Sequence, residues 1–217
     1  MKTEAEITRA RSRKIWIALT VMAIIALVAA FFLDQSATAW ITAHSSAELK
    51  RVMRIVSRVG DWPAHMVAGA IGIAIAFAAG SKAWMRIFLA MLVALALAGM
   101  TARATKIATG RARPSVKTEA RWNGPQLSSK YHAFPSGHTA ASTAFFVALF
   151  LARKKLGAPL LLIPILIAVS RMIIGAHYLS DVTVAAVVGV ICALLAVHWL
   201  CTIRNPHSAI EGSRFRT

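Results

Sequence analysis

The sequence predicts an all-α integral membrane protein with six transmembrane helices and an amphipathic interfacial helix between the first two. Hydrophobic residues make up 58% of the 217 residues and charged residues only 15%. A soluble domain carries roughly 45–50% apolar and about 25% charged residues. The apolar residues fall in blocks of about 20, the length that crosses ~30 Å of hydrocarbon as a helix. This composition excludes a disordered chain, a disulfide-stapled secreted domain and an ordinary cytosolic domain.

The six spans follow a polar, basic tail at residues 1–14. The first apolar block, 15–33, is too long for the core of a cleaved signal peptide, so we expect it to be retained. The remaining spans are predicted at 63–79, 84–100, 137–151, 158–174 and 182–200. Pro159 and Pro164 predict a kink in the fifth span. The predicted domain covers residues 15–203 and is followed by a second tail, 204–217.

Apolar and basic residues interleave at helical spacing across residues 49–59, which predicts an amphipathic helix in the membrane interface. Two interpretations of this segment stay open. It is either a passive anchor, or its arginines, Arg51, Arg54 and Arg58, gather anionic lipid near the site.

The formal net charge of +17 limits the classes of binding partner that we expect. Nucleic acid is excluded, because neither a soluble basic face nor a nucleic-acid-binding fold signature is present. Basic flanks on an anionic membrane surface, and an anionic substrate, both account for the charge. Cys192 and Cys201 lie in one apolar segment, ~13 Å apart along a helix, too far for a disulfide. The sequence predicts no oligomeric state.

The orientation in the membrane follows from the short basic connections. An even number of spans places both termini on one side. The total basic counts of the two sides are nearly equal, but the 153–155 turn and the N-terminal cluster are dense in Lys and Arg. The positive-inside rule therefore predicts that both termini are cytoplasmic.

Three polar clusters lie where predicted spans begin or end. They contain Lys106 and Arg113-Pro114; Pro135-Ser136-Gly137-His138; and Ser170-Arg171, His177 and Asp181. Because the spans alternate in direction, all three clusters are expected on the membrane face opposite the termini. Each residue also has an ordinary structural interpretation, such as snorkelling for a cation or helix capping for a serine. The coincidence of three clusters on one face favours a functional site.

The residue types in this patch predict phosphoryl transfer. Three cations, Lys106, Arg113 and Arg171, suit a dianionic phosphoryl group. Ser136 and Gly137 offer backbone N–H groups at a helix start. The four-residue spacing from His177 to Asp181 places a carboxylate beside one imidazole nitrogen and leaves the other free to attack phosphorus.

His138 is then available as the acid for the leaving oxygen. We expect no metal or other cofactor, since the chain has only eight acidic residues and Asp181 is committed to His177. The other histidines are predicted to be structural or at the surface, with His132 a candidate for the rim of the site: His44, His65, His132, His198 and His207.

Taken together, the three clusters resemble the signature of the type 2 phosphatidic acid phosphatase (PAP2) superfamily. Every signature position matches, and the resemblance covers roughly residues 60–200. It implies a six-helix lipid phosphate phosphatase with a phosphohistidine intermediate, related in core architecture to vanadium haloperoxidases and class A acid phosphatases. It also implies that His177 is the nucleophile, Asp181 its partner and His138 the general acid. The implied phosphate-binding residues are Lys106, Arg113, Ser136, Gly137, Ser170 and Arg171.

The signature indicates that the substrate carries a phosphate, but it does not indicate which lipid the phosphate is attached to. Candidate substrates are undecaprenyl diphosphate, phosphatidylglycerol phosphate, phosphatidic acid and the phosphates of lipid A. The short chain is typical of a bacterial protein, so we expect the cytoplasmic membrane with the site facing the periplasm or exterior. A lipid phosphotransferase remains an alternative. A non-enzymatic anion or lipid transporter is disfavoured, because no internal repeat is evident in the sequence.

Overall fold

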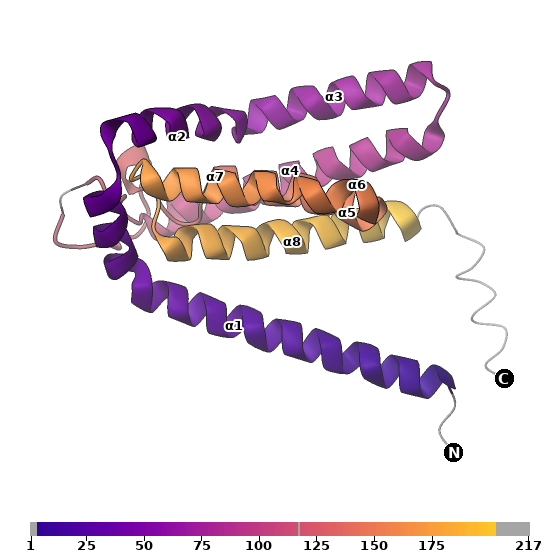
Figure 1. Cartoon of the computed structure of the whole chain (residues 1–217), viewed down its shortest axis with the longest axis horizontal. Coiled ribbons are helices and arrows are strands. Elements are labelled where there is room, and N and C mark those ends of the chain that lie inside the picture. Colours follow the sequence, from indigo (N-terminus) through magenta and orange to yellow (C-terminus); the bar gives the residue numbers. More distant parts are fainter. Residues whose placement is uncertain (1–3, 117, 203–217) are drawn as a thin grey trace.

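The computed structural model describes residues 4–116 and 118–202 and shows a bundle of helices joined by short links and one long loop (Figure 1). The helices are α1 Glu4–His44, α2 Ala47–Val59, α3 Trp62–Ala78, α4 Lys82–Thr109, α5 Gly137–Ala152, α6 Lys154–Leu160, α7 Leu162–Ile173 and α8 Leu179–Thr202, with a 3-10 turn at Ser129–Tyr131. The predicted all-α class is confirmed. The predicted tail 204–217, which includes His207, lies outside the described residues.

Four helical segments in the described chain are long and apolar enough to cross a membrane: Arg13–His44, Lys82–Thr109, Lys154–Ile173 and Leu179–Leu200. A fifth results if α2 and α3 form one span, bent by 42° between them. α5 is apolar but has only 16 residues. The predicted count of six spans is therefore not confirmed, and neither is an interfacial position for α2.

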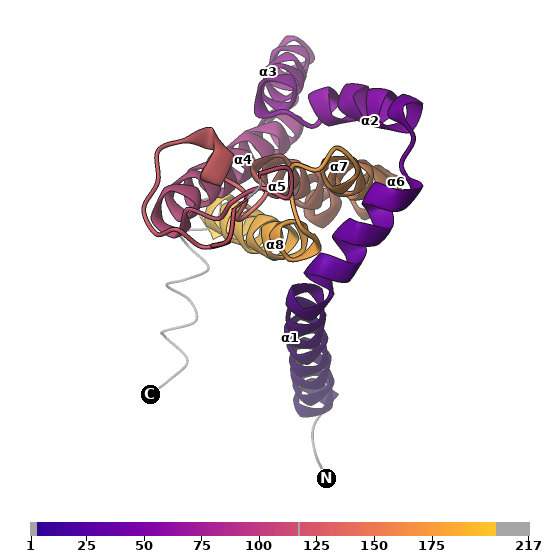
Figure 2. The same cartoon turned by 90° about the vertical axis from the view of Figure 1, so that its left-hand side faces the viewer.

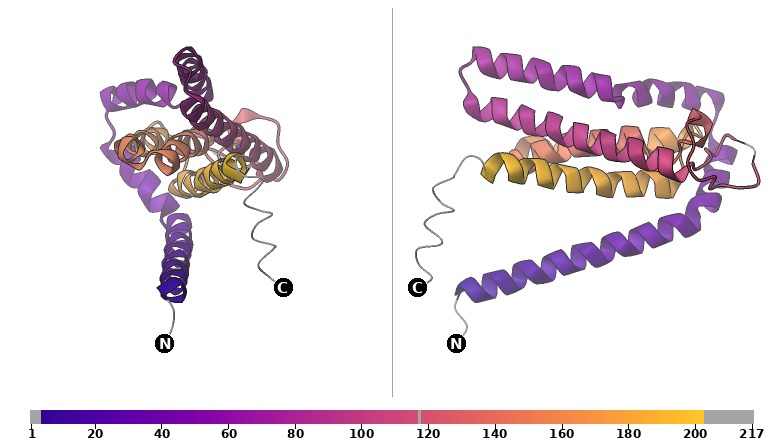
Figure 3. Two further views of the ribbon diagram at one scale, coloured as in Figure 1. Left: turned by 90° about the vertical axis from the view of Figure 1, so that its right-hand side faces the viewer. Right: turned by 180° about the vertical axis from the view of Figure 1, so that it is seen from behind.

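α5 occupies the centre of the bundle, where it packs against both α4 and α8 (Figure 3). Alanines dominate the contact between these three helices, and Ala94, Ala98, Ala144 and Ala185 are completely buried. Small side chains let helix backbones approach closely, which is the usual basis of helix packing in membranes. Large apolar side chains such as Phe32 and Phe77 face outward, as lipid contact requires.

Two helix boundaries differ from expectation. α1 begins at Glu4, within the predicted polar tail 1–14, because Glu, Ala and Arg there favour a helix that extends beyond the apolar block. The segment expected to kink at its prolines is divided into α6 and α7 at Leu161. The first half of α1 leans away from the bundle in Figure 1.

One end of the bundle collects the segments that carry the polar clusters (Figure 2). The end of α4, the start of α5, the turn from α7 to α8 and the 110–136 loop all lie there, and the N-terminus of α1 and the C-terminus of α8 lie at the other end (Figure 1). Gly110 ends α4 with a φ of 53°. A Cβ atom at Gly110 would collide with the backbone oxygen of Gly124, so this turn into the loop requires glycine.

Candidate active site

A cavity of about 870 Å³ opens at this end of the bundle. Six of the nine predicted site residues contribute to its wall: Lys106, Arg113, Gly137, His138, Arg171 and His177. The other three, Ser136, Ser170 and Asp181, are completely buried and are not part of the wall. The folded chain thus brings together the three clusters that the sequence separates.

His177 lies in the turn between α7 and α8 and is almost fully buried. Its Nδ1 atom is 2.6 Å from the backbone oxygen of Ala133. A carbonyl oxygen only accepts hydrogen bonds, so Nδ1 carries the proton and Nε2 has a free lone pair. Burial, followed by the positive charges of the three surrounding cations, holds the pKa of His177 well below its ordinary value. The ring is therefore neutral at pH 7, as a nucleophile must be.

The contact expected between His177 and Asp181 is looser than the sequence suggests. Asp181 Oδ2 is 3.6 Å from His177 Nδ1, which is too long for a hydrogen bond. That oxygen accepts instead from the backbone N–H of Tyr178, at 2.7 Å. The spacing of four residues does place the carboxylate beside the ring, but the hydrogen bond that orients the imidazole comes from a backbone carbonyl. Asp181 therefore lies beside His177 without a hydrogen bond to it.

Three of the predicted phosphate-binding residues are cations in the cavity wall. Lys106 Nζ donates to the backbone oxygen of His132 at 2.8 Å, and Arg171 Nη1 donates to Ser57 Oγ at 2.6 Å. The Nε atoms of Arg113 and Arg171 are buried, with no hydrogen-bond partner within the described protein. Buried guanidinium N–H groups without an acceptor are costly, and a bound anion would satisfy them.

The start of α5 completes this cationic region. Ser136 is the N-cap residue, and its Oγ accepts from the hydroxyl of Thr139 at 3.0 Å. Its own N–H donates to the backbone oxygen of Asp181, so Ser136 joins the start of α5 to α8. Gly137 is part of the cavity wall beside Lys106, and the helix N-terminus there favours an anion. Ser170 Oγ donates to Ile167 within its own helix.

His138 is a quarter exposed to the cavity and faces a carboxylate that the sequence analysis did not single out. Its Nε2 lies 3.5 Å from Asp61 Oδ1. Asp61 is the N-cap of α3, where it accepts from the N–H of Trp62. An acidic residue at the start of a span, in a chain with only eight acids, was the signal that would have identified it.

Arg111 is the second functional candidate that the sequence analysis missed. It lies between Lys106 and Arg113 in the first cluster, yet it is 1% exposed and points away from the cavity residues toward two carboxylates. It forms buried ion pairs with Asp181 and with Asp34 of α1. Its guanidinium also lies 4.4 Å from the ring centre of Tyr178 and 4.7 Å from that of Trp122.

The remaining predictions concern side chains outside the reacting centre. His65 is buried against Phe145 and Phe146, whereas His132 contributes to the cavity wall and makes a 2.8 Å contact from Nε2 to the backbone oxygen of Gln126. Cys192 is a free, buried cysteine. In the part of the chain that the structure describes, no three His, Cys, Asp or Glu side chains are grouped to hold a metal ion.

Comparison with known proteins places this geometry in a family. The sequence matches the family model of the PAP2 superfamily over residues 87–204, more than half of the 217 residues. A lipid A 1-phosphatase from Rhizobium johnstonii is 33% identical over 103 residues, which are 45% of this chain and 41% of that protein. An undecaprenyl-diphosphatase from Bacillus subtilis is 36% identical over 63 residues, 29% of this chain and 33% of that protein. The chain thus matches less than half the length of either relative.

Two solved structures share the fold. The crystal structure of the transmembrane PAP2-type phosphatidylglycerolphosphate phosphatase from Bacillus subtilis superposes with a TM-score of 0.63 and 20% identity, covering 84% of this chain and 94% of that one. The structure of LpxE from Aquifex aeolicus superposes with a TM-score of 0.53 and 22% identity, covering 76% and 95%.

The fold and the site define a helical membrane protein in which the two predicted catalytic histidines and the three predicted phosphate-binding cations line one cavity. The chain belongs to the PAP2 superfamily. The resemblance drawn from the three polar clusters is therefore confirmed.

Proposed function

We propose that this protein is a membrane phosphatase that hydrolyses a lipid phosphate or diphosphate through a phosphohistidine. The observation that carries the proposal is the cavity itself, which joins a cationic region to an apolar cleft. Lys106, Arg113 and Arg171 form the cationic region beside His177, and side chains of α3 and α4 form the cleft. Such a cavity fits a molecule with a phosphate at one end and a hydrocarbon chain at the other.

The first step of the proposed reaction is attack by His177 Nε2 on phosphorus. An N–P bond forms and the P–O bond to the lipid breaks, while His138 gives a proton to the leaving oxygen. The cations stabilise the charge on the equatorial oxygens. The Ala133 carbonyl and the charge of Asp181 stabilise the positive ring that results.

In the second step, water attacks the phosphohistidine. His138, now neutral, accepts a proton from that water, the N–P bond breaks, and inorganic phosphate leaves. That proton restores the acid for the next cycle, and the carboxylate of Asp61 next to His138 partly offsets the burial and the neighbouring cations, which disfavour the charged ring. This cycle needs no metal ion, so chelation is expected to leave the rate unchanged.

The apolar cleft supports a lipid rather than a soluble substrate. It is lined by Trp62 and Met66 of α3 and by Gly99 and Met100 of α4. Trp62 and Met100 are exposed at the outer surface, where the bilayer would contact them. A lipid tail can therefore stay in the membrane while its phosphate reaches His177.

The decisive experiment measures phosphate release by the purified protein from a panel of lipid phosphates. The panel contains undecaprenyl diphosphate, phosphatidylglycerol phosphate, phosphatidic acid and lipid A, each with and without EDTA. We expect phosphate release from at least one lipid, insensitive to EDTA and inhibited by vanadate, which mimics the five-coordinate transition state. Transfer of the phosphoryl group to an added alcohol in place of water would identify a phosphotransferase instead.

A variant of Gly99 tests the role of the cleft directly. A Cβ atom at Gly99 meets no atom within 4 Å, so a side chain can start there without a clash, and Gly99→Phe is designed to add a ring to the cleft. We expect KM for a long-chain lipid phosphate to rise more than tenfold, while turnover of p-nitrophenyl phosphate stays within twofold. The matched control is Ala70→Phe, which adds the same ring to an exposed position of α3 outside the cavity. Equal effects of the two variants would contradict a tail in this cleft.

A further inference from the structure

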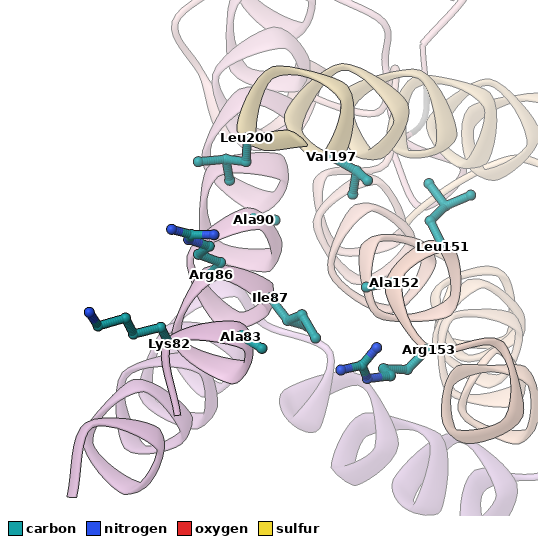
Figure 4. Close-up of a pocket in the computed structure, with 10 residues that line it drawn as sticks. All are labelled: Lys82, Ala83, Arg86, Ile87, Ala90, Leu151, Ala152, Arg153, Val197 and Leu200. Atoms are coloured by element: carbon teal, nitrogen blue, oxygen red, sulfur yellow. The ribbon is translucent and has the colours of Figure 1, made fainter. Parts of the chain in front are cut away.

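A second cavity lies at the end of the bundle opposite the candidate active site (Figure 4). Its volume is about 480 Å³, and its walls come from the start of α4, the end of α5 and the end of α8. Arg86 of α4 and Arg153, which follows α5, are drawn at its rim in Figure 4 together with Lys82. No residue of the catalytic cavity contributes to it.

The charges of this cavity are all of one sign. Lys82, Arg86 and Arg153 are exposed, and the described lining contains no acidic residue. None of the three forms an ion pair with a carboxylate among the described residues, although the guanidinium of Arg153 lies 5.4 Å from the ring centre of Trp84. A tryptophan beside basic residues is typical of the membrane–water boundary. The rim is therefore complementary to an anion held at headgroup level.

The interior of the same cavity is apolar. Ile87, Ala90, Leu151 and Val197 form its inner wall. Farther along α4, a second hollow is lined by Val93 and Leu97 and, at the level of the first cavity on α8, by residues within 195–199. Leu97 comes eleven residues after Arg86, ~16 Å along a helix, which is about the depth of one leaflet. An acyl chain that starts at the rim would therefore find apolar surface along α4 across its leaflet.

From this arrangement we propose that the cavity binds an anionic phospholipid of the leaflet opposite the active site. The phosphate lies among Lys82, Arg86 and Arg153, and an acyl chain lies along α4 and α8. Basic pockets between transmembrane helices hold anionic headgroups in this way. A second copy of the chain does not fit, because the net charge of +17 and further exposed cations at this end, Lys154 and Lys155, would repel it. The site contacts α4, α5 and α8, the three helices that pack around the core, so the lipid would join their ends.

The test compares lipid binding by native mass spectrometry of the full-length protein in detergent. The probes are dioleoyl phosphatidylglycerol and, at equal concentration, dioleoyl phosphatidylcholine. We expect the wild-type protein to retain one phosphatidylglycerol with at least tenfold higher affinity than phosphatidylcholine. The variant Lys82→Gln/Arg86→Gln/Arg153→Gln is expected to lose this preference, and Arg86→Gln alone to weaken it by about fivefold.

A control variant separates the site from general surface charge. Arg13→Gln/Lys14→Gln/Lys155→Gln removes three exposed cations near the same membrane end but outside the cavity. We expect it to bind phosphatidylglycerol like the wild type. Turnover of p-nitrophenyl phosphate, which the rim residues do not touch, reports that each variant is folded. The proposal is overturned if the control loses as much affinity as the rim variant, if the rim variant keeps the preference, or if both lipids bind equally. None of these outcomes bears on the proposed phosphatase activity.

Discussion

Arg111 and Asp181 form an ion pair that is closed to solvent, with exposed fractions of 1% and 0%. The same guanidinium pairs with Asp34 near the C-terminal end of α1, and both of its carboxylate partners are buried. Ser180 contributes further hydrogen bonds, from its N–H and its hydroxyl to Asp34. Arg111 therefore joins α1 to Asp181, which lies beside His177. Because Arg111 is not part of the cavity wall, we expect it to position Asp181 rather than to touch the substrate.

Replacing Arg111 by Gln is expected to destabilise the fold strongly. The change leaves two buried carboxylates without their shared cation, and breaking a buried pair in this way costs ~3–5 kcal/mol. The loss in free energy of unfolding is measured by adding denaturant to the protein in detergent and monitoring the circular dichroism. Arg111→Lys keeps the charge but cannot bridge both carboxylates in the same geometry, so we expect an intermediate value. An exposed change, Lys154→Gln, is the control; a free energy of unfolding for Arg111→Gln close to that of this control would contradict the structural role.

Substitution of the two histidines separates the two proposed steps. His177→Ala is expected to abolish turnover, because it removes the imidazole that we propose to attack phosphorus, and Nε2 of His132, another histidine of the cavity wall, is hydrogen-bonded to the backbone oxygen of Gln126. His138→Ala should slow release of a poor leaving group by ~10²–10⁴. With p-nitrophenyl phosphate, which needs no acid, the His138 variant should accumulate acid-labile phosphohistidine that is detectable with labelled phosphate. Near-normal rates in His177→Ala would eliminate the covalent mechanism.

Asp61→Asn tests the newly identified partner of His138. Asparagine caps a helix as well as aspartate does, so α3 should keep its start. The contact is long and the carboxylate is half exposed, which limits its worth to ~1 kcal/mol, or about fivefold in rate. We expect that loss with an alkyl phosphate and none with p-nitrophenyl phosphate. A loss of equal size with both substrates would indicate a role in binding rather than in support of the general acid.

The pH dependence of His177 follows from the direction of its pKa. The lowered pKa means that the buried ring stays neutral as the pH falls through the range in which a free imidazole, of pKa ≈ 6.5, becomes charged. The ¹⁵N chemical shifts of His177 in the substrate-free protein should therefore show a protonated Nδ1 and an unprotonated Nε2 from pH 7.5 to pH 6. Titration of His177 at or above the free imidazole value would contradict the burial seen here, and a protonated Nε2 would contradict the orientation given by Ala133.

The arginines of α2 distinguish an anchor from a substrate-gathering surface. Arg51, Arg54 and Arg58 are exposed, whereas Ser57 on the buried face of α2 accepts the hydrogen bond from Arg171. If the arginines gather substrate, changing all three to Gln should raise the apparent KM for an anionic lipid in mixed bilayers, with p-nitrophenyl phosphate turnover unchanged. The effect should vanish when the anionic carrier lipid is replaced by phosphatidylcholine. Unchanged KM in both bilayers would leave α2 as an anchor only.

The segment 49–59 shows where interpretation of the sequence by itself stops. Its amphipathic pattern correctly predicts a helix, which is α2. The pattern does not reveal what covers the less charged face, because that depends on which distant segment packs there. In the structure this face packs against α7, and Ser57 holds one of the phosphate-site cations. α2 therefore contacts the site through Ser57.

The sequence by itself determined the helical membrane class, the family and the residues whose chemistry suits a phosphoryl group, because these depend on composition, hydrophobic length and short motifs. Only the tertiary structure decided how those residues are held. The His177 ring is oriented by the carbonyl of Ala133, 44 positions away, and Arg111 is directed to Asp34, 77 positions away. Such contacts depend on how the backbones of distant helices and loops pack, which no local spacing encodes. Asp181, four residues along the chain, was the partner that spacing predicted, but its oxygens accept hydrogen bonds from Arg111 and from the backbone N–H of Tyr178.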